Sequence, residues 1–169
     1  MHERKIVERR LLFTLDIGRL GAWEIDIATG EFRASRLFAR ELGRDSINSP
    51  SSYEVLLQAV HAEDRAATKL SIDRALSGTD GLETEFRVGW PDGSVHWIRM
   101  TGQIFDEGGS YAPQLVGLSQ DVTEQREAEE RRQQAEARTT YLAYHDPLTG
   151  LANRRLLEER LRTLSLIHI

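Results

Sequence analysis

The sequence predicts an α+β fold in which an antiparallel sheet of five strands is covered on one face by helices. Two stretches of alternating apolar and polar residues lie within residues 22–34, ahead of a block of short helical segments. Three further strand-like stretches follow that block, between residues 82 and 122, and they are separated by turn residues. Strands in such a row form an antiparallel meander, which needs helices to cover its apolar face.

The composition fits a globular domain and excludes several classes of partner. The 169 residues are 40% hydrophobic and 29% charged, as in ordinary soluble proteins. The net charge of −5 and the lack of a basic stretch argue against nucleic acid as a partner. No stretch reaches the roughly 20 apolar residues that cross a bilayer, so the sequence predicts no membrane segment and a cytoplasmic location.

The chain begins with a predicted helix over residues 1–17, followed by two strands. The helix has an apolar stripe that must pack on this domain or on a second copy of the chain, and the stripe consists of Ile6, Val7, Leu11, Leu12 and Leu15. Strands are predicted at 22–27 and 31–34, with a turn at Gly30 between them.

Short helices are predicted between the second and third strands. Ser35 is a plausible N-cap for a helix over 36–43, which Gly43 ends. Residues 44–52 are rich in Ser, Asn and Pro and predict a loop. A short helix over 53–60 and a longer one over 61–78 follow, the second with acidic residues at its start and Arg74 near its end.

A β-hairpin over residues 82–105 is the clearest local prediction. Its centre, Trp90-Pro91-Asp92-Gly93, has the residues that a tight turn requires. Pairing Trp90 with Ser94 divides the side chains between two faces. The core face would hold Leu82, Phe86, Val88, Ile98 and Met100, and the other face Glu85, Arg87, Trp97 and Arg99. The second face is either an ordinary solvated surface or a docking surface.

The last strand and the segment after it differ sharply in character. Residues 114–122 are apolar in their first half, which predicts a central strand. From Thr123 no Gly or Pro occurs for more than twenty residues, so residues 124–145 predict one helix that ends before Asp146-Pro147. Heptad spacing of Ala128, Ala135 and Leu142 indicates a weak parallel dimer seam, with a solvated single helix as the alternative. A further amphipathic helix is predicted from Asn153.

Several motifs, in their order, resemble those of a PAS domain. They are GAWEID, HAEDR, ETEFRVGWPDGSVHWI, a late Gly117 and DVTEQREAE, and they cover residues 18–123. The match is to the subclass with W-x-x-D in the first strand. His61-Ala62-Glu63-Asp64-Arg65 has alanine where the family usually has proline. The resemblance implies a PAS-like sensor that binds small ligands between its sheet and its helices.

The pocket candidates are the apolar residues expected on the inner face, although plain core packing explains each of them as well. They are Trp23, Phe38, Leu56, Leu70, Phe86, Ile98, Met100 and Leu118. The sequence identifies no cofactor, and an unknown small ligand is possible. The absence of cysteine excludes cysteinyl-flavin chemistry, whereas noncovalent flavin stays open although no residue selects it. Haem needs an axial ligand, and both His61 and His96 are expected in structural positions instead.

Signal transfer is assigned to the end of the last strand. Asp121 and Thr123 predict an N-cap for the linker helix. In PAS proteins, this D-x-T motif ties the sheet to the signalling helix, so the resemblance implies that both residues transmit the signal. The expected cross-strand pair Glu85–Arg99 is a second candidate for this role. A homodimer is expected, held by Leu11, Leu12, Leu15, Ala128, Ala135 and Leu142.

The segment YHDPLTGLANRR resembles the opening of GGDEF domains, the diguanylate cyclases that make cyclic di-GMP. Residues 146–169 would then be the truncated start of such a domain. The Gly-Gly-acidic-Glu-Phe turn of the family is absent from this chain, as are catalytic and metal residues, so the chain itself should not be an enzyme. The combined prediction is a sensory PAS domain that controls cyclic di-GMP synthesis. The alternative is a ligand-free PAS dimerisation module.

Overall fold

The computed structural model describes residues 17–47, 51–78, 80–106, 108 and 112–166, in two separate units. The first unit ends at Thr123 and the second begins at Glu124. The dimer candidates Leu11, Leu12 and Leu15, with nearly all of the helix predicted over residues 1–17, lie outside the described residues.

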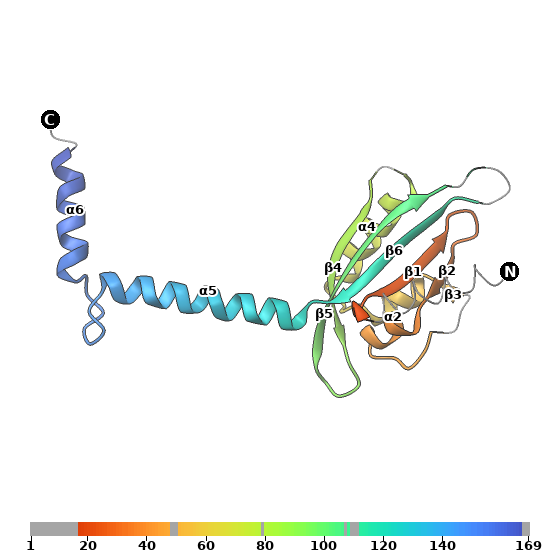
Figure 1. Ribbon diagram of the computed structural model, residues 1–169, viewed down its shortest axis with the longest axis horizontal. Helices are drawn as coiled ribbons and strands as arrows, with labels where there is room; N and C mark the ends of the chain where they lie inside the picture. Colours follow the sequence, from red (N-terminus) through yellow and green to blue (C-terminus); the bar gives the residue numbers. More distant parts are fainter. Residues whose placement is uncertain (1–16, 48–50, 79, 107, 109–111, 167–169) are drawn as a thin grey trace. The chain divides into compact units, whose positions relative to one another are not determined.

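An antiparallel sheet of six strands, in the order β3-β2-β1-β6-β5-β4, forms the first unit (Figure 1). The strands are β1 (Gly21–Asp26), β2 (Glu31–Ala34), β3 (Ser51–Ser52), β4 (Leu82–Gly89), β5 (Val95–Phe105) and β6 (Gln114–Asp121). The prediction that the last strand is central is confirmed, because β6 pairs with β1 on one side and β5 on the other. The prediction of five strands missed β3, a two-residue strand that pairs with β2 inside the segment expected to be a loop.

The hairpin of β4 and β5 has the predicted register. The backbone N–H of Trp90 donates to the carbonyl of Ser94 over 2.8 Å, and Gly93 has a φ of +87°. Only glycine adopts that backbone conformation without strain. Phe86 therefore pairs with Ile98 on the buried face, and Glu85 pairs with Arg99 on the opposite face. Turn chemistry and alternation were sufficient to fix both faces.

Three helices cover one face of the sheet, which is called the inner face below (Figure 1). They are α2 (Arg36–Glu41), α3 (Glu54–Ala59) and α4 (Arg65–Leu76). Ser35 caps α2 as predicted, because its hydroxyl accepts a hydrogen bond from the N–H of Phe38 over 3.3 Å. The helix predicted over residues 61–78 begins only at Arg65, since His61 is irregular and residues 62–64 form a turn.

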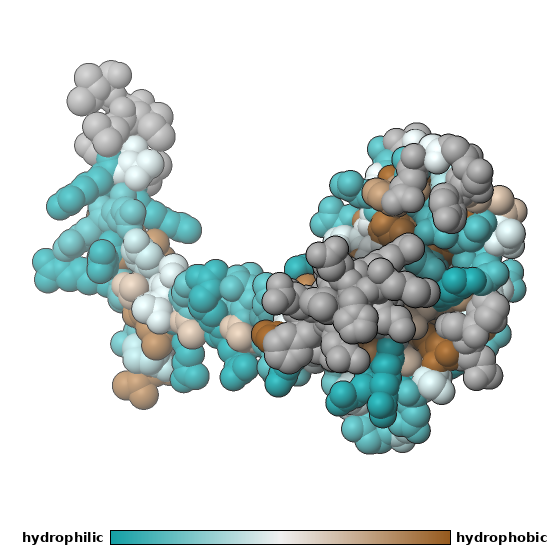
Figure 2. All heavy atoms as spheres, turned by 45° about the vertical axis from the view of Figure 1, so that its right-hand side comes forward, coloured by the Kyte–Doolittle hydropathy of each residue, from teal (hydrophilic) through white to brown (hydrophobic). Residues whose placement is uncertain are grey.

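The second unit is helical. The predicted linker is one uninterrupted helix, α5 (Thr123–Tyr144), and α6 (Arg154–Leu166) follows it. Asn153 caps α6, since its side-chain oxygen accepts a hydrogen bond from the N–H of Leu156 over 3.1 Å. None of the α5 side chains is buried, and its visible surface is mostly hydrophilic (Figure 2). Among the described residues, no helix has the length and apolar character needed to cross a membrane.

Candidate functional site

The inner face of the sheet gathers most of the predicted pocket residues. Those buried in the core are Trp23, Phe38, Leu56, Phe86, Ile98 and Met100. Two predicted members lie elsewhere. The side chain of Leu70 is 51% exposed on α4, because Ile72 takes the inward position. Leu118 is 37% exposed and lies on the outer face, because along β6 the inward residues are Leu115, Gly117 and Ser119.

The indole of Trp23 lies across the middle of the inner face, over positions at which β6 and β5 each have a glycine. Gly117 of β6 pairs with Trp23 on one side and with Gly102 of β5 on the other. A Cβ atom on Gly102 would lie 2.5 Å from Cη2 of the indole, and one on Gly117 would lie 2.3 Å from Cζ2. Both distances are far below van der Waals contact, so the indole fits only because both positions are glycine.

The polar atom of this indole has no partner. Trp23 Nε1 is buried and forms no hydrogen bond in the part of the chain that the structure describes. A buried donor without an acceptor costs on the order of 1–3 kcal/mol. The indole N–H is therefore a donor on the inner face whose hydrogen bond is not made within the described residues.

The HAEDR segment, residues 61–65, binds Arg87 near the C-terminal end of β4. Asp64 accepts hydrogen bonds from the backbone N–H of Arg87 and from its Nε, both over 2.9 Å. The Arg87 guanidinium also reaches Glu63 over 2.9 Å and lies 5.6 Å from the centre of the Trp97 ring. These bonds lower the pKa of Asp64 to about 2. The prediction that Arg87 and Trp97 share the outer face is confirmed, but the carboxylate partners of Arg87 were missed.

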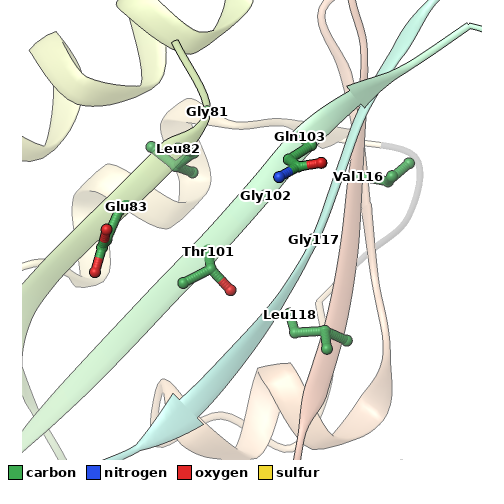
Figure 3. Close-up of a pocket in the computed structure, with 9 residues that line it drawn as sticks. All are labelled: Gly81, Leu82, Glu83, Thr101, Gly102, Gln103, Val116, Gly117 and Leu118. Atoms are coloured by element: carbon green, nitrogen blue, oxygen red, sulfur yellow. The ribbon is translucent and has the colours of Figure 1, made fainter.

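The outer face carries a groove of about 620 Å³ over the same two glycines. The backbone of Gly102 and Gly117 forms its floor, and the side chains around it belong to Glu83, Thr101, Gln103, Val116 and Leu118 (Figure 3). The predicted pair Glu85–Arg99 is present on this face, with 2.7 Å between Oε1 and Nε. This groove lies on the opposite side of the sheet from the predicted ligand pocket.

A polar cluster, made of Glu41, Trp90, His96, Ser119 and Asp121, lies at the end of the inner face where β6 leaves the sheet. Glu41 is buried, with only 6% of the residue exposed. Its Oε1 accepts a hydrogen bond from the N–H of Gly21 over 3.2 Å, and its Oε2 accepts one from the Ser119 hydroxyl. Burial, opposed in part by these two bonds, raises the pKa of Glu41 to about 7. No feature of the sequence marked this residue.

His96 and Asp121 complete the polar cluster. The ring of His96 stacks on Trp90 with 3.6 Å between centroids. Its Nδ1 is 2.7 Å from Asp121 Oδ2, and its Nε2 is 3.0 Å from the Ser94 hydroxyl. Both nitrogens of His96 are therefore engaged. His61 is exposed in the loop before α4.

The signal-transfer candidates Asp121 and Thr123 meet at the start of α5. Asp121 Oδ1 accepts hydrogen bonds from the N–H of Thr123 over 2.9 Å and from its hydroxyl over 2.5 Å. The Thr123 oxygen in turn accepts a bond from the N–H of Trp97 over 2.8 Å. Although burial opposes it, bonds from Thr123 and His96 lower the pKa of Asp121. The seam candidates Ala128, Ala135 and Leu142 are exposed along α5, and the dimer stays a prediction.

Comparison with known proteins agrees with this architecture. A family model described as the PAS fold matches residues 31–118. The protein y4lL of Sinorhizobium fredii is 36% identical over 110 residues, which is 64% of this chain and 13% of that protein. The sensor protein FixL of Bradyrhizobium diazoefficiens is 31% identical over 111 residues, 65% of this chain and 22% of that protein. A blue-light-activated histidine kinase of Brucella anthropi is 25% identical over 183 residues, 98% of this chain and 36% of the kinase.

Solved structures have the same fold. A sensory box histidine kinase/response regulator from Burkholderia thailandensis has a TM-score of 0.56 at 22% identity, covering 78% of this chain and 98% of that one. The N-terminal domain of a diguanylate cyclase with PAS/PAC sensor from Marinobacter aquaeolei has a TM-score of 0.53 at 21% identity, covering 63% of this chain and 98% of that one. The chain spans between 13% and 36% of the curated relatives' length.

These relatives correct one expectation. The sequence was taken to have no cofactor, but a relative that aligns with nearly the whole chain is a blue-light-activated kinase. A protein that responds to blue light needs a bound chromophore, because ordinary amino-acid side chains do not absorb visible light. The expectation of no cofactor was wrong as far as these relatives bear on it, because it rested on the lack of any residue that selects a cofactor.

Proposed function

This chain belongs to the PAS fold family, and we propose that it is the sensory module of a bacterial signalling protein. In this proposal, a small molecule binds on the inner face beside Trp23 and alters the packing of β6. The strand then passes the change to α5 through Asp121 and Thr123. The sensor proteins and kinases among its relatives support a sensory role.

The observation that carries the proposal is the position of β6. This strand contributes Gly117, the partner of Trp23, and four residues later Asp121, the cap of α5. A displacement of the indole therefore acts on the same short strand that starts the signalling helix. A ligand can shift such an equilibrium only by its differential affinity for the two states, and a few kcal/mol is sufficient.

The ligand class follows from the site. An aromatic or otherwise planar molecule with an acceptor atom would replace contacts of the indole and satisfy its N–H group. A light-absorbing group is one member of this class, and in this chain it would be held without a thiol.

The test is to purify the chain under native conditions, record its visible absorbance and measure its mass by native mass spectrometry. We expect a bound small molecule in the unmodified chain and reduced occupancy in Trp23→Phe, which lacks the N–H donor. The matched control is Trp97→Phe, on the outer face. Equal occupancy in both variants, or none in any preparation supplemented with cell extract, would contradict the ligand proposal.

For the output, we propose control of cyclic di-GMP synthesis by a GGDEF domain that follows the linker. The segment YHDPLTGLANRR supports this proposal, and so does the likeness to a domain of a diguanylate cyclase. The test joins this chain, in the register of Asp146-Pro147, to a complete cyclase catalytic domain. We expect Thr123→Ala to change the rate of cyclic di-GMP formation several-fold at unchanged expression. Identical rates would count against a signal that runs through the cap.

A second candidate function, a dimerisation module, is favoured by the outer groove. Leu118 is exposed on the outer face and lines this groove, whose floor lacks side chains at Gly102 and Gly117. In this case, Leu118→Lys should weaken a homodimer in sedimentation equilibrium, whereas Leu70→Lys on α4 should not. A monomer at all micromolar concentrations in the unmodified chain would exclude this role.

A further inference from the structure

We propose that Glu41 is a proton-operated switch, which couples protonation of its carboxyl group to the position of β6 at the strand end that leads into α5. The inference uses the proposed sensory role only for its output. The input, protonation of Glu41, can be measured without any ligand or partner domain.

Packing places the carboxyl group of Glu41 between two strands. Glu41 ends α2, a helix that contacts β1 and β6, and its carboxyl group bridges the two strands. The approach is close because Gly21 has no side chain. A Cβ atom there would lie 2.2 Å from the Ser119 hydroxyl and 2.7 Å from Glu41 Oε2. The carboxyl group is thus enclosed by the strand backbone on one side and by Ser119 on the other.

The charged groups around Glu41 do not compensate its negative charge. From β6, the titratable group that faces Glu41 is Asp121, whose negative charge disfavours ionisation of Glu41. From β5, His96 lies behind Asp121 and is bonded to it. From β1 only the backbone of Gly21 contacts the carboxyl group, and on α2 itself Arg40 is exposed. Among the described residues, no cationic side chain forms an ion pair with Glu41.

Protonation of Glu41 changes the hydrogen bonds that its carboxyl group can form. The ionised carboxylate draws two donors, the Gly21 amide and the Ser119 hydroxyl, and it repels Asp121. The protonated acid loses the charge and becomes a donor itself, so the hydrogen bond to Ser119 can reverse its direction. Because burial disfavours the charged form, the exchange occurs near neutral pH, where cellular pH changes can drive it.

The position of Ser119 converts this exchange into an output. Ser119 lies two residues before Asp121, on the same face of the same strand. Asp121 holds the hydroxyl and the amide of Thr123. A change in the Glu41–Ser119 contact therefore acts directly on the strand segment whose next residues cap α5.

The test is an NMR pH titration of the full chain between about pH 5.5 and 8.5, which brackets the range over which such a carboxyl group ionises. The amides of Gly21 and Thr123 should shift with a common midpoint near pH 7. Glu41→Gln should abolish that step at both amides. Because an imidazole can also titrate in this range, the control is His96→Gln, which should keep the step.

The results that would overturn the proposal are specific. A step that survives Glu41→Gln, or one that disappears in His96→Gln alone, would assign the titration to another group. If Glu41→Gln folds poorly, Ser119→Ala provides an independent reading. Loss of the hydroxyl donor removes a bond to the carboxylate, so the midpoint should move to higher pH. An unchanged midpoint in Ser119→Ala would refute the role of the Glu41–Ser119 contact.

Discussion

Replacing Gly102 by alanine should destabilise the domain through collisions with the indole of Trp23 and with the backbone of Val116. The new Cβ would lie 2.5 Å from Cη2 of Trp23 and 2.9 Å from the carbonyl oxygen of Val116. Carbon atoms pack at about 3.5–4.0 Å, so the buried ring must move by about 1 Å to relieve the contact. Such overpacking typically costs about 1–3 kcal/mol. Alanine in an unobstructed strand position would instead gain about 0.5–1 kcal/mol over glycine.

The measurement is the free energy of unfolding by urea, with Gly89→Ala as the matched control. A Cβ on Gly89 would meet no atom within 4 Å. Gly89→Ala should therefore be neutral or slightly stabilising. Combining Gly102→Ala with Trp23→Leu should recover part of the loss, with a coupling energy of about 1–2 kcal/mol. Equal effects of the two alanine variants, or no coupling to Trp23, would refute the packing argument.

Three further predictions concern stability. Because the pKa of Glu41 is raised, the free energy of unfolding should fall by about 3 kcal/mol in total as pH rises from about 4.5 through about 7. Glu41→Gln should flatten this part of the curve when urea unfolding is measured across pH. The lowered pKa of Asp64 has the opposite effect, so the stability that Asp64 contributes is complete above about pH 4 and lost as pH falls through about 2. Asp64→Asn should reduce the loss of thermal stability at acid pH. An unchanged loss would contradict the contact with Arg87. Phe86→Ala should lower the free energy of unfolding in urea by about 3–5 kcal/mol, because the side chain is fully buried. Arg99→Ala should lower it by only about 0–1 kcal/mol, because that side chain is partly exposed. Comparable losses would show that one of the two side chains is misplaced.

The sequence could predict what local chemistry determines. The turn at Pro91-Asp92-Gly93 and the alternation on either side specified the hairpin register residue by residue. The apolar start of β6 predicted its central position. The same feature misassigned Leu118, because a central strand can carry apolar residues on both faces, so that hydrophobicity alone does not say which face is inward.

Contacts between distant segments could not be predicted in this way. A glutamate near the end of a short helix has the pattern of a solvated residue, so nothing marked Glu41 as buried before the fold placed it against β1 and β6. Asp64 and Arg87 are 23 residues apart, and their pairing depends on how α4 meets β4. The HAEDR motif was a signal that this segment mattered, but it did not name the partner.

The place of β6 has a consequence for how the chain folds. The strand in the middle of the sheet is the last of the six to be synthesised. Until β6 emerges, β1 and β5 each expose an unpaired edge, and the two halves of the sheet have no hydrogen-bonded strand between them. Exposed edges of this kind recruit other chains, and a partly made sheet of distant segments forms slowly. A chain synthesised only as far as Gln114 would therefore keep both edges open to other chains.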